Sequence, residues 1–109
     1  MAIAKRYFRR EGFKVEDVSA WCSYDLLCKR ASVELHVEVK GSTTEGASVV
    51  LTNNGVKHAH DPFNSCALFV LHSIVLKAGK AAGGKQLIFN PWQLDNQRLT
   101  PISYTYRLR

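Results

Sequence analysis

The stretch VELHVEVKG, residues 33–41, alternates apolar and polar residues without a break. Successive side chains of a β-strand point to opposite faces of the sheet, so this alternation predicts a strand with its valines and leucine on one face. The other face carries Glu34, His36, Glu38 and Lys40. Such a face is either the solvated side of an ordinary strand or half of a reaction centre. Which of the two applies depends on the residues that neighbouring segments place beside it.

The composition is that of one globular domain. A chain of 109 residues, 46% apolar and 22% charged, can bury one core but not two. Three cysteines in apolar contexts favour reduced, buried thiols over a disulfide framework. The longest apolar run is too short to span a bilayer, and the N-terminus lacks the pattern of a signal peptide. We therefore expect a single domain over residues 1–109, soluble and cytoplasmic, either complete or part of a longer protein.

The charge balance favours a polyanionic partner. Fifteen Lys and Arg against nine Asp and Glu leave a net charge of +6, which attracts nucleic acid through phosphate contacts. We expect a polyanionic partner and no membrane. Charge alone defines no site, because ribosomal or chaperone-like domains are equally basic. The sequence leaves the oligomeric state open, a homodimer included.

The periodicity predicts an α+β domain in which helices cover a sheet. A helix over residues 2–10 comes first, and a second helix over 53–61 is capped by Thr52 or Asn53 and ended by Pro62. The expected strands are residues 13–19, 23–30, 33–41, 47–52, 65–77, 86–90 and 101–109. Residues 78–85, rich in Gly and Lys, are expected to form a flexible turn.

A hairpin between residues 23–30 and 33–41 would bring two carboxylates together. If only Ala31 and Ser32 form its turn, Asp25 faces Glu38. In the same register Lys29 faces Glu34, and Leu27 faces His36. Directly opposed like charges destabilise a sheet. A divalent cation bound between the two carboxylates would compensate for their repulsion.

This arrangement suits phosphodiester hydrolysis. Magnesium prefers oxygen ligands and is often held by one or two carboxylates plus substrate phosphate. We expect Asp25 and Glu38 to hold Mg²⁺ or Mn²⁺. Lys40, on the same face as Glu38, would orient the attacking water or stabilise the developing negative charge. The alternative is the wet face of an ordinary antiparallel hairpin, on which Asp, Glu and Lys are common.

Further polar and aromatic residues have two interpretations each. His36 would contact a phosphate or assist proton transfer, or else make a cross-strand polar contact. Phosphate contacts need charge without precise geometry, so dispersed lysines also qualify, with surface solvation as the alternative. The predicted nucleic-acid-binding residues are Lys29, His36, Lys57, Lys80 and Lys85.

Other conspicuous residues are expected to serve the fold. Trp21 and Trp92 would stack on bases or, more simply, pack in the core or at its rim. His58 and His60 lie two positions apart and do not share a helical face, so a solvated helix is expected there. His72 is expected to be a satisfied core or edge histidine. No phosphate-binding glycine motif is present, which disfavours nucleotide hydrolysis.

Two resemblances extend this interpretation. Asp25, followed after twelve residues by Glu38-Val39-Lys40, resembles the PD-(D/E)XK phosphodiesterase superfamily, whose restriction-endonuclease-like core is α-β-β-β-α-β. More specifically, nearly the whole chain resembles the protein NO VEIN C-terminal domain family. The segments that carry this likeness are GFKVEDVS, SYDLLCKR, HVEVKGST, VVLTNNGVKHA, LHSIV, NPWQL and LTPISYTYRL.

The resemblance implies a site and a substrate class. It implies Asp25 and Glu38 as metal ligands, the carbonyl of Val39 as a further ligand, and Lys40 as the catalytic lysine, in a restriction-endonuclease-like core with extra C-terminal strands. Members often occur within larger proteins linked to restriction or defence, which suggests DNA. This chain departs from the pattern in two places: the first helix has no acidic residue before Glu11, and Gly55 stands where a glutamate commonly follows LTNN.

Two functions from different classes follow from these observations. The first is a metal-dependent endonuclease that hydrolyses DNA phosphodiester bonds at Asp25, Glu38 and Lys40. The alternative is a catalytically inactive nucleic-acid-binding or interaction module with the same fold. The missing acidic residue in the first helix favours the alternative, whereas the intact Asp25, Glu38 and Lys40 favour the endonuclease.

Overall fold

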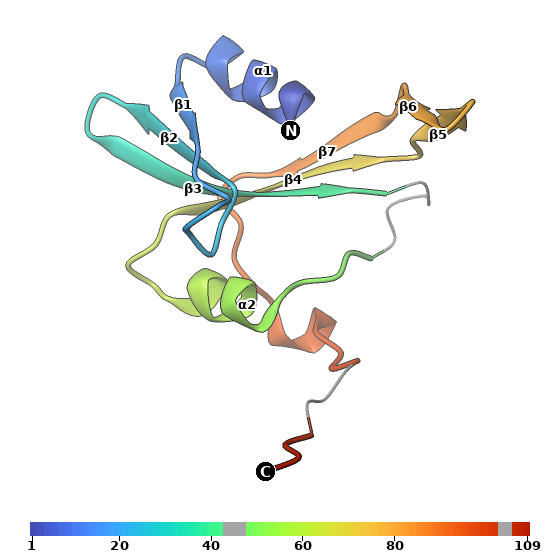
Figure 1. Ribbon diagram of the computed structural model, residues 1–109. Coiled ribbons are helices and arrows are strands. Elements are labelled where there is room, and N and C mark those ends of the chain that lie inside the picture. Colours follow the sequence, from blue (N-terminus) through green and yellow to red (C-terminus); the bar gives the residue numbers. More distant parts are fainter. Residues whose placement is uncertain (43–47, 103–105) are drawn as a thin grey trace.

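The chain folds into a mixed α+β domain around one five-stranded sheet (Figure 1). The computed structural model describes residues 1–42, 48–102 and 106–109. The elements in chain order are α1 (Ala2–Arg10), β1 (Lys14–Asp17), β2 (Leu26–Arg30), β3 (Val33–Gly41), α2 (Asn53–His60), β4 (Cys66–His72), β5 (Val75–Lys77), β6 (Lys80–Ala82), β7 (Lys85–Phe89) and the 3-10 helix η1 (Asn96–Arg98). The strand order is β1-β2-β3-β4-β7, and only the central pair β3 and β4 is parallel.

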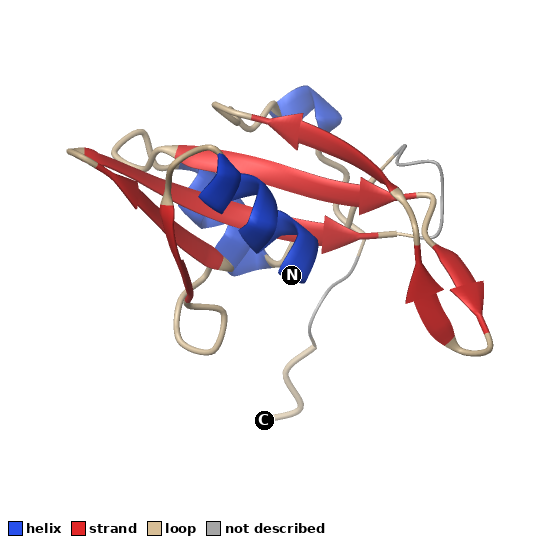
Figure 2. Ribbon diagram, turned by 90° about the horizontal axis from the view of Figure 1, so that it is seen from above, coloured by secondary structure: helices blue, strands red, loops and turns tan. Residues whose placement is uncertain are grey.

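The core lies between α1 and one face of the sheet. Ala4 and Phe8 on α1 are buried against apolar side chains of the central strands, among them Leu26, Val37 and Phe69. On β3 the buried Leu35 and Val37 alternate with polar residues, so that this strand turns its apolar side towards the helix, whereas β4 is buried on both faces. Figure 2 shows α1 lying across the strands. The predicted helix over residues 2–10 and the predicted strand over 33–41 are therefore confirmed with the same bounds.

The second helix lies on the opposite side of the sheet from α1 (Figure 1). Thr52 caps α2, its side chain accepting a hydrogen bond from the N–H of Gly55, as predicted from the preference for Thr at this position. The helix ends at His60, two residues before Pro62. Because α2 covers the polar face of β3, it lies beside the residues that the sequence analysis singled out.

Two predicted strands are wrong in the residues that the structure describes. Residues 48–52 of the expected strand 47–52 form no strand, and neither do residues 101–102 and 106–109 of the expected strand 101–109. Residues 47 and 103–105 lie outside the described ranges. Alternation shows which side chains would share a face, but a strand also needs a neighbouring strand whose backbone groups are free to pair.

The expected long strand over residues 65–77 is divided in two. It breaks at Ser73, whose φ of 55° turns the chain out of the extended conformation. The residues after the break form a two-stranded ribbon, β5 and β6, that occupies part of the expected flexible turn over 78–85. Figure 2 shows this ribbon projecting beyond the end of the main sheet. Among the described residues, no helix is long and apolar enough to cross a membrane.

Candidate catalytic centre on the polar face of the sheet

The predicted hairpin register is correct along β2 and β3. Lys29 lies opposite Glu34 and Leu27 lies opposite His36, with residues 31 and 32 left to form the turn. The ladder ends where Leu26 pairs with Val37. Asp25 therefore lies one residue outside β2 instead of in a ladder pair with Glu38, and its backbone N–H donates to the carbonyl of Val37.

Asp25 is fixed by the strand that carries the other proposed ligands. Its Oδ2 atom accepts a 2.8 Å hydrogen bond from the backbone N–H of Val39, and its carbonyl accepts from the N–H of Val18. Across the described part of the chain, Oδ1 has no hydrogen-bond partner. The Asp25 carboxylate is thus held in place just before the start of β2, and its Oδ1 atom accepts no hydrogen bond from the described residues.

The Glu38 side chain is largely buried. It is 14% exposed, and its Oε1 atom lies 3.3 Å from Nζ of Lys40. Burial raises the pKa of Glu38, the charge of Asp25 raises it further, and Lys40 opposes both effects. The two carboxylates therefore repel each other across a partly desolvated space, and a bound cation would favour their ionised forms.

The first turn of α2 covers this pair. A Cβ atom at Gly55 would lie 3.9 Å from Oε2 of Glu38 and 3.1 Å from Oγ1 of Thr52. Gly55, where the resemblance commonly has a glutamate, is consequently within side-chain reach of the Glu38 carboxylate. An acidic residue there would add a third group to the site, and glycine supplies none.

The oxygen atoms present fit a hard cation. In the described residues there is no cluster of three or more His, Cys, Asp and Glu side chains placed to hold a metal. Asp25 and Glu38 each offer one oxygen, and the carbonyl of Val39 lies on the same strand edge as its N–H, which points at Asp25. Two carboxylates and a carbonyl suit Mg²⁺ or Mn²⁺ and lack the imidazole and thiolate groups typical of zinc.

A histidine pair that the sequence analysis missed adjoins the carboxylates. Nδ1 of His36 lies 2.8 Å from Nε2 of His58, and Nε2 of His36 lies 3.0 Å from Oε1 of Glu34. The ring of Tyr24 stacks on His36, with centroids 4.0 Å apart. The expectation that the helix carrying His58 is solvated is thus wrong for this residue, which is partly buried.

A signal for this pair was present in the sequence. His58 follows Gly55 by three positions, and residues so spaced share a helical face. Gly55 is buried against the sheet, so this face turns His58 inward. Burial is the largest cause of a lowered pKa at His58, and the neighbouring His36 lowers it further. His60 points away and contacts Asn96 through its ring nitrogen.

The lysines predicted to bind nucleic acid do not form one cluster. Lys29 lies on the polar face of the sheet opposite Glu34, and Lys85 lies on the far edge strand opposite His72. Lys57 is on α2, and Lys80 is on the separate ribbon. All four are exposed. They lie on four different elements, an arrangement that suits dispersed phosphate contacts and ordinary solvation equally.

The two tryptophans differ in their surroundings. Trp92 is half-buried, and its backbone N–H donates to the carbonyl of Cys66. Trp21 is 70% exposed in the loop between β1 and β2, so the expectation of core or rim packing is wrong for it. His72 contacts Ser73 at the end of β4 and is partly buried, as expected of a satisfied histidine.

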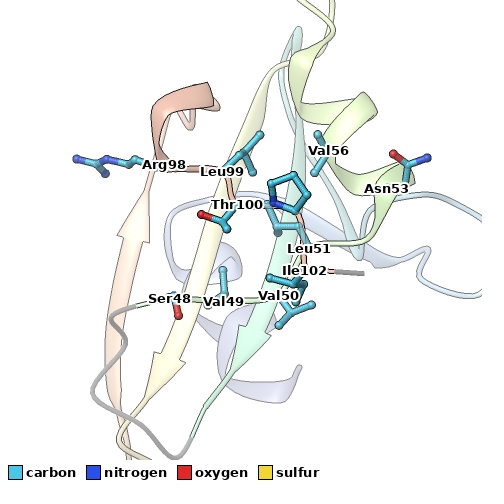
Figure 3. A pocket seen from close by; sticks show the side chains of 11 residues that line it. Ser48, Val49, Val50, Leu51, Asn53, Val56, Arg98, Leu99, Thr100 and Ile102 are labelled. Carbon is cyan, nitrogen blue, oxygen red and sulfur yellow. The ribbon is translucent and has the colours of Figure 1, made fainter. Parts of the chain in front are cut away.

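A cavity of about 530 Å³ lies away from the carboxylates (Figure 3). It is open to solvent and is bordered by the segment before α2, by α2 itself and by the chain after η1. Val49, Leu51, Val56, Leu99 and Ile102 supply much of its wall. A neighbouring cavity of about 500 Å³ reaches the apolar part of β4 and β7. Neither is lined by a residue proposed for catalysis.

Comparison with known proteins defines the family. No curated protein and no solved structure matches the chain. The family model described as "Protein NO VEIN, C-terminal" matches residues 1–83, which include the hairpin, both helices and the carboxylate pair. The match covers well over half of the chain, and we conclude that this chain belongs to the protein NO VEIN C-terminal family.

Proposed function

We propose that this domain is a metal-dependent endonuclease that hydrolyses phosphodiester bonds of DNA. One observation carries the proposal: the Asp25 and Glu38 carboxylates share a partly buried site, and the Lys40 ammonium lies 3.3 Å from Glu38. Proteins seldom place two negative charges together in a partly buried site unless a bound ligand compensates for their repulsion. The net charge of +6 supports a polyanionic substrate.

Each group has a distinct role. A magnesium or manganese ion bound at this site would polarise a phosphoryl oxygen and lower the pKa of a coordinated water. Asp25, held by the Val39 N–H, and Glu38 would hold the cation through their negative charge. The Lys40 ammonium, beside Glu38, would orient water or stabilise the charge that develops on phosphorus.

The element order supports a restriction-endonuclease-like core. From α1 to β4 the chain runs α-β-β-β-α-β, with α1 and α2 on opposite sides of the sheet (Figure 1). In this proposal, the acidic residues lie at one end of a hairpin in the middle of the sheet, where rigid strands limit their movement. Precise positioning of this kind is what phosphoryl transfer requires.

A second function is supported by the contacts of Glu38. Lys40 already neutralises one of its oxygens, and Gly55 leaves the site without the third acidic group that the resemblance commonly supplies. A domain of this kind would keep the basic surface and bind nucleic acid without cutting it. The two functions differ in whether a divalent cation binds between Asp25 and Glu38.

Nicking of supercoiled DNA, combined with thermal melts in magnesium, separates the two functions. Wild type and the control Glu16→Gln, an exposed carboxylate on β1, should nick DNA and melt higher with magnesium. Glu38→Gln should do neither. If wild type shows no nicking and no magnesium-dependent shift, the endonuclease proposal is wrong and the binding module stands.

A further inference from the structure

The ribbon formed by β5 and β6 is a projecting basic element with no described packing partner to explain it. All six of its strand residues are exposed. Its turn is tight, because Ala78 and Gly79 both have positive φ, at 52° and 77°, as in a two-residue type I′ hairpin. An isolated two-stranded hairpin is only marginally stable in water. A ribbon with a tight turn and fully exposed strands therefore suggests an element that interacts with another molecule.

Its tip concentrates positive charge. Lys77 lies directly opposite Lys80 on the two sides of the turn. Like charges so placed repel each other, and within the described ranges neither lysine pairs with an acidic side chain. An anion between or beside the two ammonium groups would remove this repulsion. Phosphate oxygens of a nucleic acid supply such a charge.

The ribbon starts at the end of the sheet where Lys40 lies. Lys40 pairs with Val70 across the parallel strands, and Val75, the first residue of the ribbon, follows five positions later. Five residues span at most about 18 Å. The ribbon begins beside the end of β3, because the N–H of Ile74 donates to the carbonyl of Ser42, two residues after Lys40, and it projects from that end of the sheet (Figure 1).

We propose that the β5–β6 ribbon is a DNA-binding arm that enters a groove of duplex DNA, where Lys77 and Lys80, which project from the same face of the ribbon, contact the phosphates along one strand of the duplex. This inference rests on the proposed function, and it specifies the substrate as double-stranded. Three residues of strand span roughly 10 Å. That length matches a major groove about 8.5 Å deep and about 12 Å wide, which admits a two-stranded ribbon.

The test measures binding without cleavage. The full chain is titrated with a labelled DNA duplex in EDTA across a range of salt concentrations. Lys77→Ala with Lys80→Ala should weaken binding and make the slope of log K against log salt shallower by about 1.8, since each phosphate contact contributes about 0.9. The charge-matched control is Arg6→Ala with Arg10→Ala, two exposed positions on α1, which should change the slope much less.

Two outcomes would overturn the inference. The first is that the ribbon and control variants lose affinity equally or not at all. The second is that the ribbon variant loses as much affinity for heparin, a polyanion without grooves, as for the duplex. Melting temperatures should not change, because the substituted side chains are exposed. The titration is done in EDTA, so no cleavage takes place. Loss of DNA binding by the ribbon variant is therefore a separate result from absence of nuclease activity.

Discussion

The backbone N–H of Val39 donates a hydrogen bond to the Asp25 carboxylate at 2.8 Å. The bond joins β3 to the residue just before β2, so it fixes one proposed metal ligand through the strand that carries the other. Because the partner is a backbone group, any side chain with an oxygen acceptor at position 25 can preserve the bond.

This bond separates two substitutions of Asp25. Asp25→Asn keeps an acceptor for Val39 and removes a negative charge near Glu38, so the metal-free domain should melt at or above wild type. Asp25→Ala leaves a partly buried N–H unpaired and should cost about 1–3 kcal/mol. Neither variant should nick DNA. Equal melting of the two variants would show that the hydrogen bond does not stabilise the domain.

Glu38→Gln should stabilise the metal-free domain at neutral pH. Burial and Asp25 raise the pKa of Glu38 above 4.5, so the folded state binds this proton more tightly than the unfolded state. The stability that Glu38 contributes through this tighter proton binding is present below pH 4.5 and is lost as pH rises through the folded-state pKa of Glu38. Glutamine removes the repulsion, worth about 1 kcal/mol or less, or a few degrees in Tm. A variant that melts well below wild type would mean that the carboxylate serves the fold through its contact with Lys40.

Lys40→Ala should separate metal binding from turnover. The substitution removes the cation that lies beside Glu38, so metal-free protein should be less stable and should gain more in Tm from magnesium than wild type does. Loss of a group that stabilises transition-state charge typically lowers kcat by about 10²–10³-fold. Thermal melts and nicking assays over a magnesium titration measure both effects. Unchanged nicking would exclude Lys40 from the reaction.

The partly buried pair of His36 and His58 should make stability sensitive to mild acid. The pKa of His58 is lowered from 6.5 by burial and by His36, while Asp61 opposes this. The unfolded state then binds this proton more readily, so stability is fully present above pH 6.5 and is lost as pH falls through the folded pKa. Urea unfolding at about pH 7.5 and about pH 5.5 should show a larger loss for wild type than for His58→Gln. Equal losses would place the acid sensitivity elsewhere.

Phe8 and Phe63 provide a matched pair for the core. Phe8 is fully buried between α1 and the sheet, whereas Phe63 is 95% exposed. Phe8→Ala should cost about 3–5 kcal/mol, and Phe63→Ala should change stability by less than about 0.5 kcal/mol. Chemical denaturation of both variants checks this. Comparable losses would mean that Phe63 is covered in solution.

The sequence by itself determined the local elements and the face on which each side chain lies. Alternation over residues 33–41 and the short connection at Ala31 and Ser32 were sufficient for the hairpin register, because a strand has only two faces and a short turn permits few registers. Thr52 and Pro62 bounded the second helix for equally local reasons. The family, too, followed from short segments spread along the chain.

Only the tertiary structure decided which elements meet. The pairing of His36 with His58 requires α2 to pack on the polar face of β3, and the approach of Gly55 to Glu38 depends on the same packing. The break at Ser73 and the ribbon after it also escaped the sequence pattern, since an apolar run continues past the residue at which the chain turns. Periodicity encodes the orientation of side chains within one element, whereas contacts between elements depend on distances that no local pattern contains.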